Sequence, residues 1–200
     1  AGGFDEAIRV HEHYLEGTGA PLVVDAEIMR DYGPVNDAEQ AILGILSDWF
    51  GGGEDDLTFG RPWLDLADGE RIVVGDPSVG PSHIDGLVRW ETVFKGPKKT
   101  DLSNYFTDAR MTFNGGTLES FSQLSFERHG DRIEVSGFMR LRVADHYDFE
   151  DDHILKSKVL EDHGGAKSFD ISTTLWVRPI SGWIDISASS GPTVHLTYDD

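Results

Sequence analysis

The chain has 200 residues, of which 38% are hydrophobic and 10% are aromatic, so it can bury the core of a globular domain and does not have the composition of a disordered chain. Its formal charge of −19 disfavours nonspecific binding to nucleic acid or anionic lipid, because both require positive charge on the protein. The lack of cysteine excludes disulfides, thiol catalysis and cysteine-based zinc sites, and no apolar run reaches the roughly 18 residues of a membrane helix.

The first fifty residues carry the apolar periodicity of two short helices. Residues 4–16 form the first helix, which Gly17 can close in a left-handed conformation. The capping pair Asn36 and Glu39 opens the second helix, which ends before Gly51. The apolar-face side chains that recur at helical spacing are Phe4, Ile8, Val10, His11, Tyr14 and Leu15 in the first helix and Ile42, Ile45, Leu46 and Trp49 in the second.

From about residue 57 onward, the pattern is that of strands separated by glycine-rich turns. The segments that we expect to be strands are 71–75, 86–94, 109–113, 119–128, 132–143, 169–177, 182–188 and 193–198. The tripeptide HGD at 129–131 predicts a hairpin turn, and the stretch 179–182 predicts a break between two strands. In strand 132–143, apolar residues occupy odd positions on both sides of Gly137, which predicts a bulge or a bend there.

These elements predict one α+β domain over residues 1–200. Short N-terminal helices occupy about 1–56, and a mainly antiparallel sheet, strongly curved or closed, occupies about 57–200. No internal repeat and no persuasive linker divides the chain. Function must then be argued from particular side chains, because a fold of this class serves many activities.

The highest concentration of acidic, histidine and tyrosine side chains follows strand 132–143, where HYDFEDDH at 146–153 comes directly after Asp145. In an extended conformation Asp145 and Tyr147 point to one side of the chain, and His146 and Asp148 to the other. Closely spaced carboxylates repel one another, so they raise a pKa or attract Mg²⁺ or Ca²⁺. A solvated acidic loop has the same composition. An EF-hand is excluded, because the stretch has no mid-loop glycine.

Four residues of this cluster, Asp145, Tyr147, Asp148 and His153, resemble the D-x-Y-D-x5-H-R signature of the colicin M family of bacterial toxins. The strand with an internal glycine that leads into the motif agrees with that family's layout. The opening HYLEGTGAPLVV at 13–24 is also similar to toxin domains of this broad type. The resemblance implies a half-open β-barrel and a Mg²⁺-dependent hydrolase. Such an enzyme cleaves the peptidoglycan precursor lipid II between its undecaprenyl chain and the pyrophosphate.

The resemblance also implies roles for these side chains. Asp145 and Asp148 would form the metal or electrostatic pair, and Asp145 would activate the attacking group. His153 would transfer a proton, and Tyr147 would position a phosphate oxygen. A divalent cation is needed between a pyrophosphate and so acidic a protein. An antibacterial bacteriocin of this kind would act in the periplasm of the target cell and would have an immunity protein as its partner.

The chain departs from the family signature in two places. Four residues separate Asp148 from His153, where the family has five, and Ile154 stands where the family has arginine. Lys156 and Lys158 are candidates for the missing positive charge. A toxin scaffold with a changed target therefore stays open, as does a different class of protein. That alternative is a non-enzymatic β-rich binding or structural module whose acidic loop is solvated or holds Ca²⁺.

Two further groups of side chains are candidates for a metal site and for a sugar-binding site. His11 and His13 form an H-x-H pair, which a helix would place about 200° apart, so that they cannot act as a ligand pair. The tryptophans could line a sugar platform, although core positions are the more common use of such residues. They are Trp49, Trp63, Trp90, Trp176 and Trp183.

Overall fold

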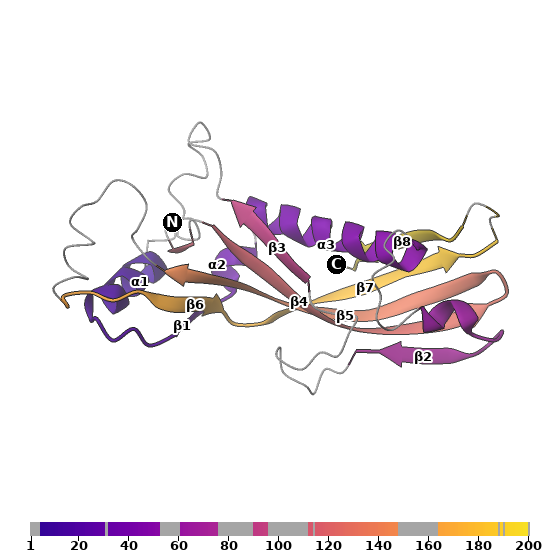
Figure 1. The fold of residues 1–200 in the computed structure, drawn as a ribbon, viewed down its shortest axis with the longest axis horizontal. Helices are drawn as coiled ribbons and strands as arrows, with labels where there is room; N and C mark the ends of the chain where they lie inside the picture. Colours follow the sequence, from indigo (N-terminus) through magenta and orange to yellow (C-terminus); the bar gives the residue numbers. More distant parts are fainter. Residues whose placement is uncertain are drawn as a thin grey trace. The chain divides into compact units, whose positions relative to one another are not determined.

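The protein has an α+β fold with a few helices and a large mixed sheet that is mostly antiparallel, as the sequence predicted, and that is not closed into a barrel (Figure 1). The computed structural model describes residues 5–30, 32–52, 61–75, 90–95, 112–113, 115–147, 164–187, 189 and 191–199, with the backbone alone for 90–95. Within those ranges no helix is long and apolar enough to cross a membrane.

The helices lie in the first third of the chain. They are α1 (Asp5–Leu15), α2 (Glu27–Arg30), α3 (Gly33–Gly51) and a 3₁₀ helix at Pro62–Asp65. The first predicted helix is confirmed, and Gly17 after it has φ of +67°, the left-handed conformation expected of a helix-closing glycine. Its predicted apolar face is partly wrong, because Ile8 and Leu15 are exposed while Val10 and Tyr14 are buried.

The sheet contains eight strands in the described part of the chain. They are β1 (Leu22–Val24), β2 (Arg71–Val74), β3 (Trp90–Lys95), β4 (Gly115–His129), β5 (Arg132–Tyr147), β6 (Phe169–Thr173), β7 (Trp176–Asp185) and β8 (Thr193–Tyr198). The order is β1-β6-β5-β4-β2, while β3 pairs with β4 and β7 pairs with both β5 and β8. Strands β1 and β6 run parallel.

The chain folds into two compact units that interleave in the sequence. Unit 1 contains residues 1–38, 93–118 and 142–175, and unit 2 contains residues 39–92, 119–141 and 176–200. Strands β4 and β5 contribute residues to both units. The predicted boundary between a helical front and a β-rich remainder therefore does not coincide with these units.

Aromatic stacking between α3 and the sheet builds the core of unit 2. The ring of Phe50, near the end of α3, meets the rings of Trp63 and Phe126 at centroid distances of 5.2 Å each. Trp63 and Phe126 are stacked at 4.9 Å. All three side chains are at most 2% exposed. Such pairs favour specific ring geometries beyond the burial of apolar surface, so they fix how α3 lies on the sheet.

The hairpin predicted at 129–131 is confirmed, since β4 ends at His129 and β5 begins at Arg132. Gly130 has φ of +61°, which a two-residue turn requires, and its N–H donates to Asp68 at 2.7 Å. Apolar residues at odd positions of β5 are buried from Ile133 to Val143, as predicted.

The predicted bulge at Gly137 is wrong on the side of β7, because the register with that strand continues through Gly137 without a break. A Cβ at Gly137 would lie 2.1 Å from the backbone oxygen of Gln123. The glycine therefore allows a close approach of β4 to β5.

The predicted helix cap and the predicted boundary between two of the late strands were also wrong. Helix α3 begins at Gly33, so Asn36 and Glu39 lie inside it and do not cap it, and Glu39 is buried. Segments 169–177 and 182–188 do not form strands divided at 179–182, since the break falls after Thr173 and β7 runs through Pro179.

Most of the remaining strand predictions were confirmed, but one segment was not, and one strand was missed. Of segment 109–113, residues 109–111 lie outside the described residues, and Thr112 and Phe113 are not in a strand. Strand β1 was missed, because three residues are too few to show a periodicity. The predicted strands at 71–75, 86–94, 119–128 and 193–198 correspond to β2, β3, β4 and β8.

Candidate functional site

The described part of the acidic cluster lies at the end of β5, within unit 1. Strand β5 continues to Tyr147, four residues beyond the predicted end, so Asp145, His146 and Tyr147 are part of the sheet and do not follow it. Asp145 is opposite Ile171 of β6, and Tyr147 is opposite Phe169. The other two motif residues, Asp148 and His153, lie outside the described residues, as do Lys156 and Lys158.

Asp145 and Tyr147 share a face of β5, as the extended conformation predicts. They continue the odd-numbered face whose preceding residue, Val143, is fully buried, and both are half-buried themselves. His146 is exposed on the opposite face. The strand thus brings one carboxylate and one phenol to the edge of a packed core, where burial changes the chemistry of the phenol.

Aromatic rings surround Tyr147. Its ring is stacked on Phe169 at a centroid distance of 5.2 Å and meets the edge of Tyr14 at 6.0 Å. Phe169 in turn contacts His13 edge to face at 4.6 Å. His13 and Tyr14 belong to α1 and begin the HYLEGTG stretch. The fold therefore places that stretch beside the D-x-Y residues, more than a hundred positions away in the sequence.

Burial raises the pKa of Tyr147 to about 12. The charged phenolate is disfavoured because neighbouring rings replace water around the oxygen. Tyr147 therefore stays neutral at any physiological pH and retains its O–H as a hydrogen-bond donor. That is the property required of a group that positions a phosphate oxygen.

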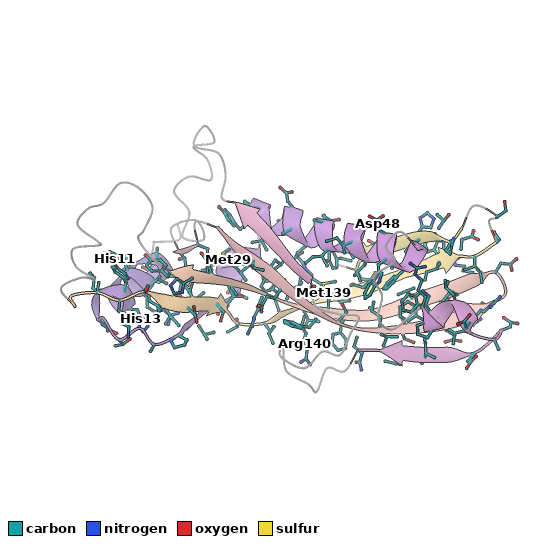
Figure 2. All side chains as sticks on the ribbon, in the orientation of Figure 1. His11, His13, Met29, Asp48, Met139 and Arg140 are labelled. Atoms are coloured by element: carbon teal, nitrogen blue, oxygen red, sulfur yellow. The ribbon has the colours of Figure 1, made fainter. Side chains whose placement is uncertain are left out.

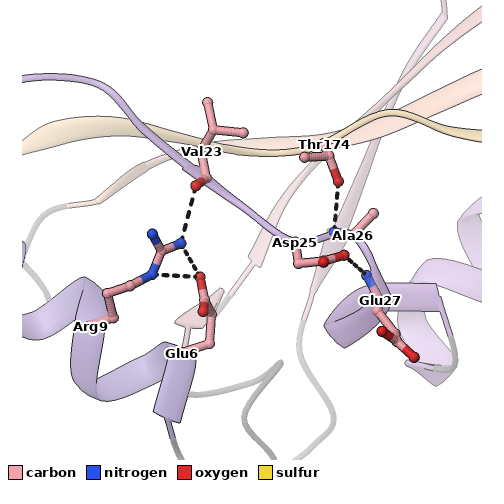
Figure 3. Close-up of polar contacts among 7 residues, drawn as sticks. All are labelled: Glu6, Arg9, Val23, Asp25, Ala26, Glu27 and Thr174. Carbon is pink, nitrogen blue, oxygen red and sulfur yellow. Dashed lines mark hydrogen bonds and ion pairs between the residues drawn. The ribbon is translucent and has the colours of Figure 1, made fainter.

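Hydrogen bonds fix the backbone around this strand end. The N–H of Val143 donates to the Thr173 hydroxyl at 3.0 Å, which ties β5 to β6 beyond the ladder itself. Thr174, which follows β6, accepts from the N–H of Ala26 at 3.0 Å (Figure 3). On the neighbouring helix, Arg9 is paired with Glu6 and donates to the carbonyl of Val23 (Figure 3).

Two polar contacts of the cluster involve His146. The carboxylate of Asp145 accepts from the backbone N–H of His146 at 2.8 Å. The Nδ1 atom of His146 lies 2.9 Å from a carboxylate oxygen of Asp170 on β6. Asp170 was not among the site residues that the sequence predicted. The alternation of FDIST at 169–173 was a signal for its outward position, but not for its partner.

A metal ion fits the described residues only in part. Within the ranges that the structure describes, no group of three or more His, Asp or Glu side chains could hold one. Of the predicted metal pair, Asp145 supplies a carboxylate at the strand end, while Asp148 falls outside those ranges. A Mg²⁺ site at this position would therefore use Asp145 together with oxygen ligands from the adjoining acidic residues.

The histidines of α1 do not form a ligand pair. His11 and His13 both lie on the helix, as expected (Figure 2). The Nε2 atom of His13 is 2.8 Å from the carbonyl of Ala20, and its ring contacts Phe169. The ring of His11 is stacked with Tyr14 at 6.4 Å. His13 thus has a structural role beside the candidate site.

Comparison with known proteins does not add to this picture. No family model, no curated protein and no solved structure matches the chain. The resemblance to the colicin M family therefore rests on the motif residues and on the stretch at 13–24.

Proposed function

We propose that this chain is an antibacterial toxin domain that hydrolyses lipid II, with Mg²⁺ as its cofactor, and so blocks cell-wall synthesis. One observation carries the proposal. Asp145 and Tyr147 lie next to each other on the core-side face of β5, and the ring of Tyr147 contacts Tyr14 of the HYLEGTG stretch. Both stretches that resemble the toxin family thus meet in one unit, although they are distant in sequence.

The chemistry of the two described residues supports hydrolysis at a phosphorus centre. Tyr147 is a neutral phenol held in place by two aromatic neighbours, so its O–H is oriented before a substrate binds. Asp145 is a half-buried carboxylate next to it and can accept a proton from an attacking water. A bound Mg²⁺ would neutralise the pyrophosphate, which a chain of charge −19 would otherwise repel.

The remaining roles fall to residues of the adjoining segment. His153 would give a proton to the leaving group, and Asp148 would complete the metal pair with Asp145. Lys156 or Lys158 would supply the positive charge that the family takes from arginine at the position of Ile154. An immunity protein is the expected partner, and the periplasm of a target cell is the expected site of action.

A cleavage assay on purified lipid II tests the proposal. The full chain, with Mg²⁺, should release undecaprenol and a pyrophosphorylated disaccharide-peptide, and chelation of the metal should stop the reaction. Asp145→Asn should lower the rate by roughly a hundredfold or more, since it removes the acceptor of the proton. Asp170→Asn is the matched control, because this carboxylate lies on the neighbouring strand and pairs with the exposed His146.

Two results would overturn the proposal. One is the absence of cleavage by a folded wild-type chain at millimolar Mg²⁺. The other is full activity of Asp145→Asn. A non-enzymatic module would show no activity to lose, and its Asp145 variant would differ from the wild type only in stability or in Ca²⁺ binding.

A further inference from the structure

A groove lies on the exposed face of the sheet in unit 2, and none of its lining residues belongs to the proposed hydrolase site. Its volume is about 590 Å³, and its lining comes from β2, β4, β5, β7 and β8. Small-ligand sites occupy roughly 300–1,000 Å³. The groove is therefore large enough for a ligand of several rings, and its residues have no part in the function proposed above.

Short hydroxyl side chains form the floor of this groove. Ser136 is paired with Ser181, and Ser181 with Thr197, so that adjacent strands place their hydroxyls in one row. The two-residue turn of the β4–β5 hairpin places Ser125 opposite Ser136 and extends the row by one strand. The floor offers donors and acceptors, of which Ser125 already accepts from Arg71 and Ser181 already donates to Asp199.

The wall of the groove is formed by longer side chains of the adjoining rows. Trp183 on β7 is paired with His195 on β8, and the two rings are stacked at 4.7 Å. The guanidinium of Arg132 on β5 lies 4.3 Å from the centre of the Trp183 ring. Because β5 and β8 flank β7 on opposite sides, the indole stands between the guanidinium and the imidazole. This stack holds both polar groups in place before a ligand arrives.

Two carboxylates complete the wall. Glu134 is paired with Trp183, and the same hairpin register places Glu127 opposite Glu134. Arg71 is paired with Glu127 from the other side. Like charges opposite one another in a sheet are unfavourable, and a ligand that donates hydrogen bonds to both carboxylates would relieve this cost.

The balance of charge limits the class of ligand. The groove holds two arginines and two glutamates, so it is locally close to neutral on a chain of charge −19. An anionic ligand would be repelled by the rest of the protein. An apolar ligand would bury the charged and hydroxyl groups of the groove away from water, which is costly. An extended peptide pairs with the free edge of a strand, whereas the groove lies on the face of the sheet, across strands that are paired with one another.

We infer that this groove binds a neutral saccharide. Carboxylate and guanidinium groups each present two polar atoms side by side, which suits the adjacent hydroxyls of a sugar ring. The serine and threonine hydroxyls bind the remaining oxygens from below. Both faces of the Trp183 ring are covered by Arg132 and His195, so recognition depends on hydrogen bonds and not on ring stacking. Among the tryptophan side chains that the structure describes, Trp183 is the one that lines this groove.

Titration of the full chain with chitotriose, cellotriose and maltotriose tests this assignment. Tryptophan fluorescence and calorimetry should show that at least one trisaccharide binds, with one site per chain and a Kd of about 1 mM or tighter. No binding of any of the three at ten times that concentration would overturn the assignment. Tighter binding of a lysine-rich peptide at the same groove would also overturn it, in favour of a basic protein partner.

Variants locate the binding. Glu134→Gln should weaken it about tenfold, because it replaces a charge-assisted hydrogen bond by a neutral one. Val177→Ala is the control, since Val177 is an exposed residue of the same β7 strand outside the groove. Equal affinity of Glu134→Gln and wild type would refute the location. Asp145→Asn should bind the saccharide like the wild type, so a failure of the hydrolase proposal would leave this test intact.

Discussion

The carboxylate of Glu39 offers the sharpest test of how unit 2 is held together. This side chain on α3 is only 2% exposed and accepts a hydrogen bond from the indole N–H of Trp176 at 2.9 Å. The Nε atom of Arg178 donates to the same carboxylate at 3.1 Å. Tyr198 donates its hydroxyl to the backbone oxygen of Glu39 at 3.0 Å. A single helical residue thus connects α3 to β7 and β8.

The expected cost of Glu39→Ala follows from what it leaves behind. Removal of one partner of a buried ion pair costs about 3–5 kcal/mol, because the other charge stays buried without compensation. The side chain of Arg178 is 30% exposed and can turn partly into water, so the lower end of that range applies. The indole of Trp176 cannot move in this way, and its unpaired N–H costs about 1–3 kcal/mol. We expect a total loss of about 4 kcal/mol or more.

The free energy of unfolding in urea, measured on the full chain, tests this expected loss. Glu39→Gln should cost less, about 1–2 kcal/mol, because the amide oxygen still accepts from Trp176. Asp48→Ala, an exposed acid on the same helix, controls for the relief of self-repulsion in so acidic a protein (Figure 2). In a double-mutant cycle, Glu39→Ala and Arg178→Ala should be coupled by more than about 1 kcal/mol. A loss below about 1 kcal/mol for Glu39→Ala would refute the reasoning.

Three further predictions concern β5 and its neighbours. Gly137→Ala should destabilise the protein by about 3 kcal/mol in the same urea assay, because φ is +157° and the new Cβ would overlap the backbone of β4. Asp170→Asn should change the free energy of unfolding by less than about 0.5 kcal/mol, since its pair with His146 is exposed. Tyr147 ionises near pH 10 when unfolded and at about 12 when folded, so its stabilising effect is complete below pH 10 and is lost as the pH rises through 12. Phenolate absorbance should contain a step near pH 12 that Tyr147→Phe removes, and a step near 10 would contradict the burial.

The sequence predicted β5 well because that strand obeys a local rule. Burial of the odd-numbered face extends from Ile133 to Val143, interrupted at Gly137, and Asp145 and Tyr147 continue that face as half-buried residues, which is why they could be assigned to it. The end of the strand was placed too early. Its last residues pair with β6, and a contact with a strand more than twenty residues away leaves no mark in the local pattern.

The proline at position 179 misled the sequence analysis for a physical reason. Proline interrupts a ladder only where its missing N–H would have been used. The carbonyl of Pro179 accepts from Asp199, so the missing N–H also faces the β8 side. The ladder with β8 begins only at the next residue, Ile180, which pairs with Tyr198. Strand β7 therefore loses only the reciprocal bond to Asp199 at the end of this ladder, and the expected turn does not form.

Glu39 was wrongly assigned to a helix cap because its local sequence pattern says nothing of its long-range partners. A glutamate three residues after an asparagine is a local capping signal, whereas its true partners lie 137 and 139 residues later in the chain. Those partners are the tryptophan and the arginine at the start of β7, and neither has a spacing that points to α3. Long-range polar pairs of this kind depend on the fold and cannot be inferred from one sequence.

A Tyr147 variant distinguishes a hydrolase from a non-enzymatic module better than an Asp145 variant does. An aspartate at the edge of a core can affect stability, metal binding and catalysis, so loss of activity in its variant has several explanations. The ring of Tyr147 is packed between Phe169 and Tyr14, and phenylalanine keeps that packing. Tyr147→Phe removes only the neutral O–H. A folded Tyr147→Phe protein whose turnover of lipid II falls while its stability is unchanged would assign the hydroxyl to the substrate. Unchanged turnover would reduce the phenol to a packing group and leave the chemistry to the carboxylates.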